Sequence, residues 1–235
     1  MRSGSNSEGD GARGYSIWFV LVTAGFITCL IAANITGVKL VELRGWVVPA
    51  GIIVFPISYI FGDVLTEVYG YAQARRVIWL GFFCNLLTVA AIWIGQILPP
   101  APFWDGQAAY ERILGYTPRL LAASFSAYLF GEFTNAYVLA RMKALTRGRW
   151  LWMRTIGSTL VGQAVDSLLF LTLAFAGTIP TSALFRTFLT QWLAKSLYEA
   201  AATPATYAIV AFLKRKEGVD VYDLKTRFTP LSLRG

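Results

Sequence analysis

Long apolar segments recur along this chain, and they restrict what it can fold into more than any other feature of the sequence. Six are apparent, and each can supply the roughly 18 residues that cross the hydrocarbon core of a bilayer as a helix. Their expected bounds are 17–35, 46–69, 77–98, 120–140, 156–176 and 184–213. Only 14% of the residues are charged, against about 25% in soluble domains. The sequence therefore predicts an all-α fold, a polytopic membrane protein built as a six-transmembrane-helix bundle.

The positive charges decide the expected orientation and domains. Most of the 21 Lys and Arg residues fall on one side of the spans, notably in 141–154 and 214–234. Such residues are enriched in cytoplasmic loops, so both termini are expected to be cytoplasmic. We expect a disordered cytoplasmic lead over 1–14, the transmembrane domain over 15–215 and a cytoplasmic tail over 216–235. Because the charges are dispersed, nucleic acid is not an expected partner.

Several kinds of chemistry are excluded by residues that the chain lacks. There is no His, which excludes Ser-His-Asp and Cys-His catalysis and His-based metal sites. No Gly-rich phosphate loop of the Walker type occurs, so ATP hydrolysis by this chain is excluded. Cys29 and Cys84 lie inside apolar segments and are expected to be packing residues. The chain is expected to be a transporter that is not an enzyme, with no cofactor and no metal.

Ionisable and amide side chains inside the spans are the candidate functional residues. A charge at mid-bilayer costs about 2.5–3.5 kcal/mol on insertion scales, so these groups should face the bundle interior or a wet cavity. The candidates for substrate binding are Asn34, Asn85, Glu132, Asn135, Gln163, Asp166, Lys195 and Glu199, with Tyr59 and Tyr128 as aromatic lining. The candidates for a gate or ion coupling are Asp63, Glu67 and Arg75. The alternative is that these groups bond one another across helices and need no ligand.

A weak internal repeat links three of the acids. YIFGD at 59–63 resembles YLFGE at 128–132, and Glu199 follows at nearly the same interval. Three helical hairpins, each contributing one acid, are therefore one expected architecture.

A longer pattern of motifs resembles the queuosine precursor transporter family, formerly described as putative vitamin uptake transporters. The resemblance rests on FPISYIFGDVLTEVYG at 55–70 and continues through 74–76, 131–135 and 154–159 to Gln163, Asp166, Ser167, Lys195, Glu199 and Pro204. It covers roughly residues 17–225 and leaves out the polar N-terminal lead.

This resemblance implies a multi-pass importer in the bacterial inner membrane for 7-cyano-7-deazaguanine or 7-aminomethyl-7-deazaguanine, the precursors of the modified tRNA base queuosine. The alternatives are the substrate-binding subunit of an energy-coupling-factor vitamin importer, an intramembrane aspartyl protease that pairs Asp63 with Asp166, and a structural scaffold without a ligand. A homodimer is left open. Binding of a deazaguanine is compatible with the residues, because its N–H groups suit carboxylates and its carbonyl suits an amide or Lys.

Overall fold

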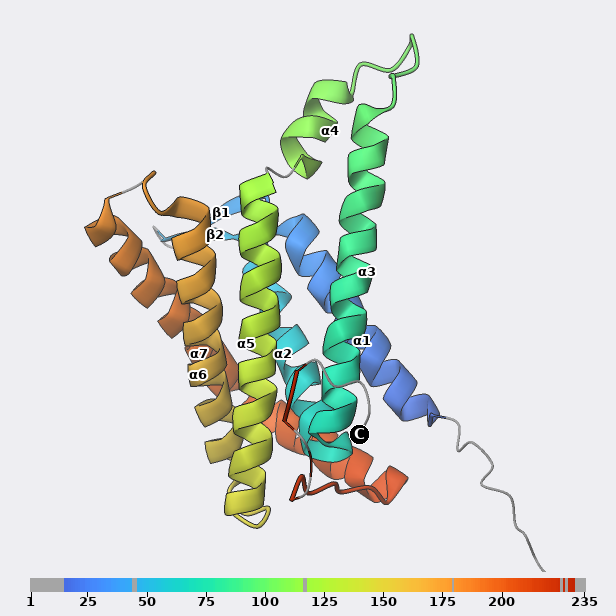
Figure 1. Ribbon diagram of the computed structural model, residues 1–235, viewed down its shortest axis with the longest axis vertical. Coiled ribbons are helices and arrows are strands. Elements are labelled where there is room, and N and C mark those ends of the chain that lie inside the picture. Colours follow the sequence, from blue (N-terminus) through green and yellow to red (C-terminus); the bar gives the residue numbers. More distant parts are fainter. Residues whose placement is uncertain are drawn as a thin grey trace, which may run out of the picture.

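The computed structural model describes residues 15–43, 46–115, 118–178, 180–224, 226 and 228–230, and within them the chain is mostly helical (Figure 1). The expected lead over 1–14 and parts of the expected tail over 216–235 lie outside the described residues.

Five of the expected spans are long helices. They are α1 (Ile17–Thr36), α3 (Tyr71–Ile97), α5 (Pro118–Leu145), α6 (Leu151–Phe175) and α7 (Thr181–Glu217). By length and composition, α1, α3 and α6 are each able to cross a membrane. The other two long helices are interrupted by more polar residues, which lowers their hydropathy. Pro204 does not break α7, which is continuous on both sides of it.

The second expected span, 46–69, is not one helix, and the prediction is wrong for its first part. The strands β1 (Leu40–Leu43) and β2 (Trp46–Pro49) form an antiparallel hairpin, followed by a short 3₁₀ helix, η1 (Ala50–Ile53). The α-helix α2 (Phe55–Val64) begins only where Pro56 occupies its first turn, a position at which proline costs no hydrogen bond. The π-helix η2 (Leu65–Tyr69) follows α2 directly and ends at Gly70, its C-cap.

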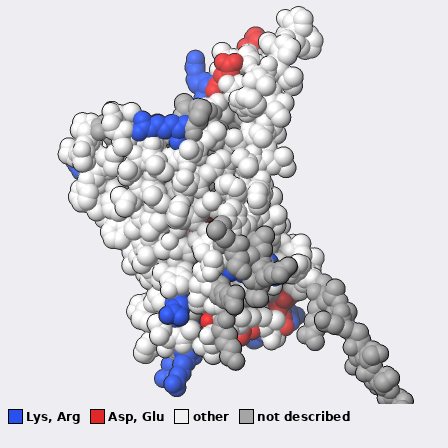
Figure 2. Space-filling view, in the orientation of Figure 1, with Lys and Arg blue, Asp and Glu red and all other residues white. Residues whose placement is uncertain are grey.

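On the face drawn in Figure 2, the charged side chains at the surface lie mostly toward the two ends of the molecule. Figure 2 shows a broad uncharged band between blue and red patches at either end of the long axis, as expected for a protein embedded in lipid. The short helix α4 (Gln107–Leu114) and the hairpin lie at one end, and the α5–α6 turn and the described residues of 218–230 lie at the other (Figure 1). We refer to these as the α4 end and the tail end.

Glycines allow the helices of the bundle centre to approach closely. A Cβ on Gly162 of α6 would lie 2.7 Å from the Cβ of Asn135 in α5, and one on Gly131 of α5 would lie 2.8 Å from the Cβ of Asp166. Small residues permit such backbone contact between membrane helices. These contacts bring the polar residues of α5 and α6 next to each other.

Candidate functional site

A cavity of about 510 Å³ occupies the α4 end of the bundle. Its lining comes from α1, η1, α2, α4, α5, α6 and α7, and reaches from Arg112 and Ile113 of α4 down to Tyr128 of α5. This volume lies within the range of about 300–1,000 Å³ of small-molecule sites. Of the residues expected to bind substrate, four line it: Asn34, Tyr128, Asp166 and Lys195.

An ion pair and aromatic rings form the inner part of this cavity. Lys195 Nζ lies 2.8 Å from Asp166 Oδ2 and 4.3 Å from the centroid of the Phe55 ring. Phe170 and Gln191 also line the wall. A carboxylate, an ammonium group, an amide and aromatic faces thus converge on one space. Such a lining can hold a planar polar heterocycle by stacking and by hydrogen bonds to its edge.

An acidic layer lies one helical turn beyond this cavity, toward the tail end. Glu132 follows Tyr128 by four residues and Glu199 follows Lys195 by four, so each is one turn deeper on the same helix face. Asp63 reaches the same layer from α2 and interacts electrostatically with both glutamates. All three are 2% exposed or less. The three acids of the proposed repeat thus lie together, although the repeat itself stays a prediction.

Hydrogen bonding in the acidic layer is incomplete. Asn135 Nδ2 donates to Asp63 Oδ1 at 2.8 Å, but Asp63 Oδ2 accepts no bond within the described residues. Neither carboxyl oxygen of Glu199 has a hydrogen-bond partner there, nor does Gln163 Oε1. Buried polar atoms in folded proteins are nearly always bonded. These atoms are therefore exceptions to that rule within the described residues.

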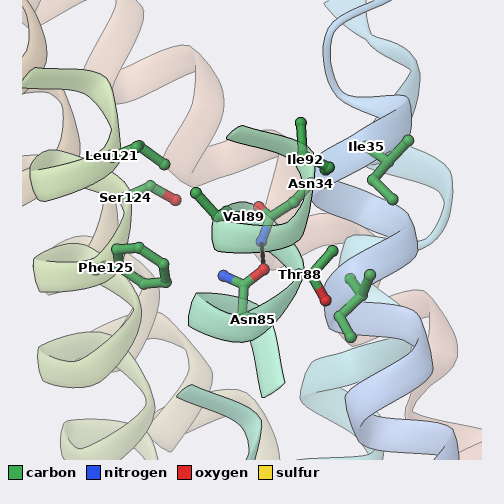
Figure 3. Close-up of a pocket in the computed structure, with 10 residues that line it drawn as sticks. Asn34, Ile35, Asn85, Thr88, Val89, Ile92, Leu121, Ser124 and Phe125 are labelled. Atoms are coloured by element: carbon green, nitrogen blue, oxygen red, sulfur yellow. Dashed lines mark hydrogen bonds between the residues drawn. The ribbon is translucent and has the colours of Figure 1, made fainter. Parts of the chain in front are cut away.

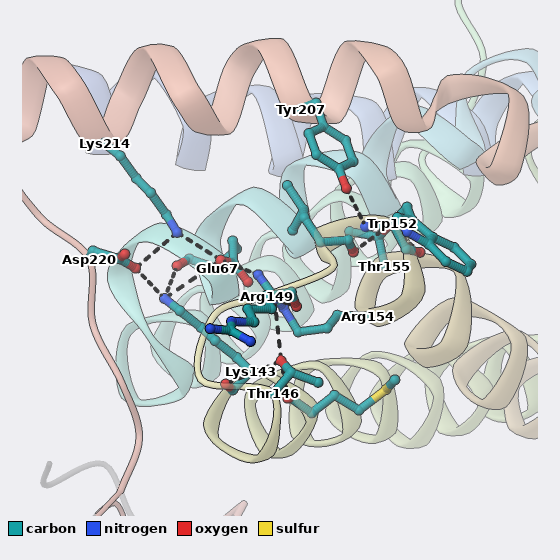
Figure 4. A network of polar contacts seen from close by, with 12 residues as sticks. Glu67, Lys143, Thr146, Arg149, Trp152, Arg154, Thr155, Tyr207, Lys214 and Asp220 are labelled. Carbon is teal, nitrogen blue, oxygen red and sulfur yellow. Dashed lines mark hydrogen bonds and ion pairs between the residues drawn. The ribbon is translucent and has the colours of Figure 1, made fainter.

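A network of ion pairs around Glu67 follows at the tail end of the bundle (Figure 4). Glu67 Oε1 lies 2.8 Å from Arg154 Nη2, 2.8 Å from Lys214 Nζ and 3.7 Å from Lys143 Nζ. Asp220 adds a second acid, 2.5 Å from Lys143 Nζ and 2.9 Å from Lys214 Nζ. Arg154 also donates to the Arg149 carbonyl. The network joins η2, α5, α6, α7 and the segment after α7.

This network stabilises the negative charge of Asp220. Burial would raise the pKa of its carboxyl, but hydrogen bonds from Lys143 and Lys214 outweigh burial and hold the pKa below its ordinary value. Asp220 is therefore an anion at neutral pH, and it balances part of the positive charge that Glu67 alone leaves unmatched.

Residues 218–230, of which 225 and 227 are not described, cover the tail end, and we call them the C-terminal segment. Tyr71 N, at the start of α3, donates to Asp223 Oδ2 at 2.9 Å. Arg75, an expected gate residue, donates to the Thr229 carbonyl at 3.0 Å, and Trp79 donates to the Pro230 carbonyl at 2.9 Å. Arg75 is thus placed against the C-terminal segment, whereas the cations paired with Glu67 come from α5, α6 and α7.

Asn34 and Asn85 bond one another, as the packing alternative predicts. Asn34 Nδ2 donates to Asn85 Oδ1 at 3.2 Å, joining α1 to α3 (Figure 3). A small cavity of about 20 Å³ beside them is lined also by Thr88 and Ser124, and a polar space of that size has room for about one water molecule. Asn34 reaches the large cavity as well, whereas Asn85 lines the small one.

Comparison with known proteins identifies the family. The family model described as "Putative vitamin uptake transporter" matches residues 49–209. The chain belongs to this family. The "Probable queuosine precursor transporter" of Bacillus subtilis (strain 168) is 33% identical over 212 residues, which is 89% of each protein. The "Queuosine precursor transporter" of Escherichia coli (strain K12) is 27% identical over 57% of this chain and 58% of that protein. No solved structure matches.

Membership of this family shows a membrane transporter, and the geometry agrees with it. The pair that an aspartyl protease would need is not assembled, because Asp63 is bonded to Asn135 and Asp166 to Lys195. Sequence reasoning missed Lys143, Arg154 and Lys214 as site residues of the transporter. For Lys143 and Lys214 the sequence signal is a positive charge near a span end, which indicates orientation, whereas Arg154 also belongs to the family motif at 154–159. Sequence reasoning also missed Phe55 and Phe170 in the cavity wall.

Proposed function

We propose that this transporter imports 7-deazaguanine precursors of queuosine, 7-cyano-7-deazaguanine or 7-aminomethyl-7-deazaguanine, across the bacterial inner membrane. The observation that carries the proposal is the cavity of about 510 Å³ that holds the Lys195–Asp166 pair beside Phe55. The relatives' names, which specify queuosine precursors, give the substrate class. A scaffold without a ligand would have no need of a cavity lined in this way.

The roles of the residues follow from the chemistry of the ligand. A deazaguanine presents a ring N–H and an exocyclic amine side by side, and one carboxylate can accept from both. Asp166 is the carboxylate that faces the cavity, and Lys195 is placed to donate to the ring carbonyl. Phe55, Tyr128 and Phe170 supply faces for stacking. Glu132, Asn135, Gln163 and Glu199 lie deeper, as a second set of contacts reached during transport.

The orientation expected from the Lys and Arg residues gives each end of the molecule a side of the membrane. With both termini cytoplasmic, the α4 end faces outward and the tail end faces the cytoplasm. The cavity then opens toward the source of the precursor. The Glu67 network and the C-terminal segment form the cytoplasmic closure, in agreement with a gate role for Glu67 and Arg75.

Uptake in cells that cannot synthesise deazaguanines tests the proposal. Each precursor is supplied outside, and queuosine in tRNA is measured in cells with the wild-type chain, Asp166→Asn or Glu111→Gln. We expect Asp166→Asn to abolish salvage and Glu111→Gln, in α4 and exposed, to retain it. The same queuosine content with and without the gene would refute the proposal. Loss of salvage on deletion of a separate ATPase would favour the energy-coupling-factor alternative.

A further inference from the structure

The acidic layer between the cavity and the Glu67 network contains more negative charge than the described residues around it neutralise. Asp63, Glu132 and Glu199 are each 2% exposed or less, and none of them forms an ion pair with a described cation. Lys195, the nearest ammonium group along α7, is paired with Asp166. At the tail end, Lys143, Arg154 and Lys214 are paired with Glu67 or Asp220, and Arg75 donates to the Thr229 carbonyl. Three buried carboxyl groups therefore share one layer without a compensating charge.

Such an arrangement cannot remain fully ionised. An uncompensated buried carboxylate costs several kcal/mol even after relaxation, so the group takes up a proton or a cation instead. Like charges in one site have the same effect, since all of them cannot ionise together. Glu132 interacts electrostatically with Asp166 and Glu199, and Asp63 interacts with Glu132, Glu199 and Glu67. Among the described residues, none of the positively charged groups forms an ion pair with an acid of this layer.

A proton fits this layer better than a metal ion does. A metal requires several oxygen ligands that converge on one point. Among the described residues no three acidic or thiol side chains converge in that way. A proton needs only one oxygen, and both oxygens of Glu199 are buried without a hydrogen-bond partner in the described chain. Gln163 Oε1, also buried and unpartnered, can accept from a protonated carboxyl as the helices move.

We propose that Asp63, Glu132 and Glu199 form a proton-binding site, and that transport is coupled to protons through it. The proton enters from the cavity, rests on the acidic layer and leaves past Glu67 when the tail end opens. The identity of the cargo rests on the proposed function. The proton site itself does not. The charged and titratable groups facing the layer are Tyr59 and Glu67 from α2 and η2, Tyr128 from α5, Asp166 from α6, Lys195 from α7 and, beside Tyr128, Cys84 from α3.

The placement of the layer gives the coupling a physical basis. Glu132 and Glu199 lie four residues, about 6 Å along the helix, beyond Tyr128 and Lys195, so a substrate on Asp166 is next to Glu132 and Glu199. With the layer protonated, the interior is neutral enough for the helices to rearrange around the cargo. With the layer ionised, carboxylates left without partners oppose closure over the cavity. Protonation therefore favours the loaded state that turns toward the cytoplasm.

Infrared spectroscopy of the purified full chain in lipid tests the proton site without any substrate. The C=O stretch of a protonated carboxyl is followed as pH is raised, in the wild type, Glu199→Gln, Glu132→Gln and the control Glu111→Gln. We expect protonated-carboxyl bands at neutral pH in the wild type and in Glu111→Gln, with a band lost in Glu199→Gln. The Glu132→Gln variant keeps the test decisive if Glu199→Gln does not fold. Absence of any protonated carboxyl at neutral pH would overturn the proposal.

Transport measurements then test the coupling. In vesicles loaded with a pH-sensitive dye, we expect inward movement of 7-aminomethyl-7-deazaguanine or its cyano analogue to acidify the interior. Glu199→Gln should lose the accumulation driven by an acidic exterior, whereas the control Glu111→Gln should keep it. Accumulation that follows a sodium gradient, or that is unchanged by pH, would refute coupling. If neither deazaguanine moves but the Glu199-dependent infrared band is present, the assigned cargo is wrong and the proton site stands.

Discussion

Lys195 Nζ and Asp166 Oδ2, which lie 2.8 Å apart, join α7 to α6 at the inner part of the cavity. The two residues are 29 positions apart in the chain, and both remain partly accessible, at 18% and 10% of their side chains. A pair that is open to the cavity can exchange its partner for a ligand. The pair is therefore placed to link α6 to α7 when no substrate is bound, and its two residues are placed to bind different polar groups of a substrate.

Exchange of the pair for neutral groups should separate its two roles. Lys195→Met alone leaves Asp166 without its cation, and we expect a loss of stability of about 1.5–3 kcal/mol, typical of hydrogen bonds to charged groups. The double change Lys195→Met with Asp166→Asn should recover much of the unfolding temperature in detergent but none of the uptake. Uptake that returned with stability would show that the pair serves packing only.

Glu67→Gln should be severely destabilising. Glu67 is fully buried and lies between Arg154, Lys214 and Lys143, so its neutralisation leaves several cations facing one another. Removal of one partner of a buried ion pair costs about 3–5 kcal/mol. Thermal unfolding of the purified variant checks this, with the exposed Glu111→Gln as the matched change. A variant as stable as the wild type would contradict the assigned role of Glu67.

Gly131→Ala should separate α5 from α6. The added Cβ would lie 2.8 Å from Asp166 Cβ and 3.2 Å from the Tyr59 hydroxyl. Overpacking of this kind costs about 1–3 kcal/mol, more than the roughly 1 kcal/mol that Ala gains over Gly in a helix. Gly157→Ala in α6 is the control, because its Cβ meets only the flexible end of Met142 at 3.1 Å. Reduced unfolding temperature and uptake are expected for the first change only, and equal behaviour of both would argue against close α5–α6 packing.

Asp223→Ala should loosen the C-terminal segment from α3. The carboxylate caps the free N–H of Tyr71 at the start of that helix, and loss of such a cap costs about 0.5–2 kcal/mol. Asp223→Asn keeps an acceptor oxygen and should restore most of the stability. Limited proteolysis at sites after α7 measures the release of the C-terminal segment, and it is compared among the wild type, Asp223→Ala and Asp223→Asn. Equal cleavage of the Ala and Asn variants would contradict the capping role.

Acidification should weaken the tail end through Asp220. Because its folded pKa is lowered, its contribution to stability is complete above the ordinary Asp pKa of about 3.9 and is lost as pH falls through the lowered value. Unfolding temperature measured against pH should therefore fall more steeply in the wild type than in Asp220→Asn. The difference should shrink at high salt, since Asp220 is partly exposed. Parallel pH curves at low salt would refute the ion-pair role.

The membrane helices were predictable because their signal is local. The composition of an apolar run such as 17–35 is enough to predict a helix, and the bounds of α1 agree with that prediction to within one residue. The hairpin Leu40–Pro49 was not predicted, because its valines suit a membrane span as well as a strand.

The site was predictable only in its residue types. Asp166 and Lys195 line the cavity, which agrees with the rule that polar groups in spans face inward, while their role as site residues stays a prediction. The rule could not separate the cavity wall from the acidic layer, because a single helical turn decides between Lys195 and Glu199. The partners of Glu67 depend on contacts between residues 76–147 positions apart, and no local pattern encodes such distances.

The C-terminal segment also sets an order in which the molecule can be completed. Residues 218–230 follow every membrane helix in the chain, so the ribosome delivers them only after all the helices have been made. Until they arrive, Tyr71 N, Arg75 and Trp79 lack the acceptors that the segment provides. The contacts between the C-terminal segment and α3 can therefore form only after α1 to α7 have been synthesised, so they belong to a late step in the assembly of the tail end.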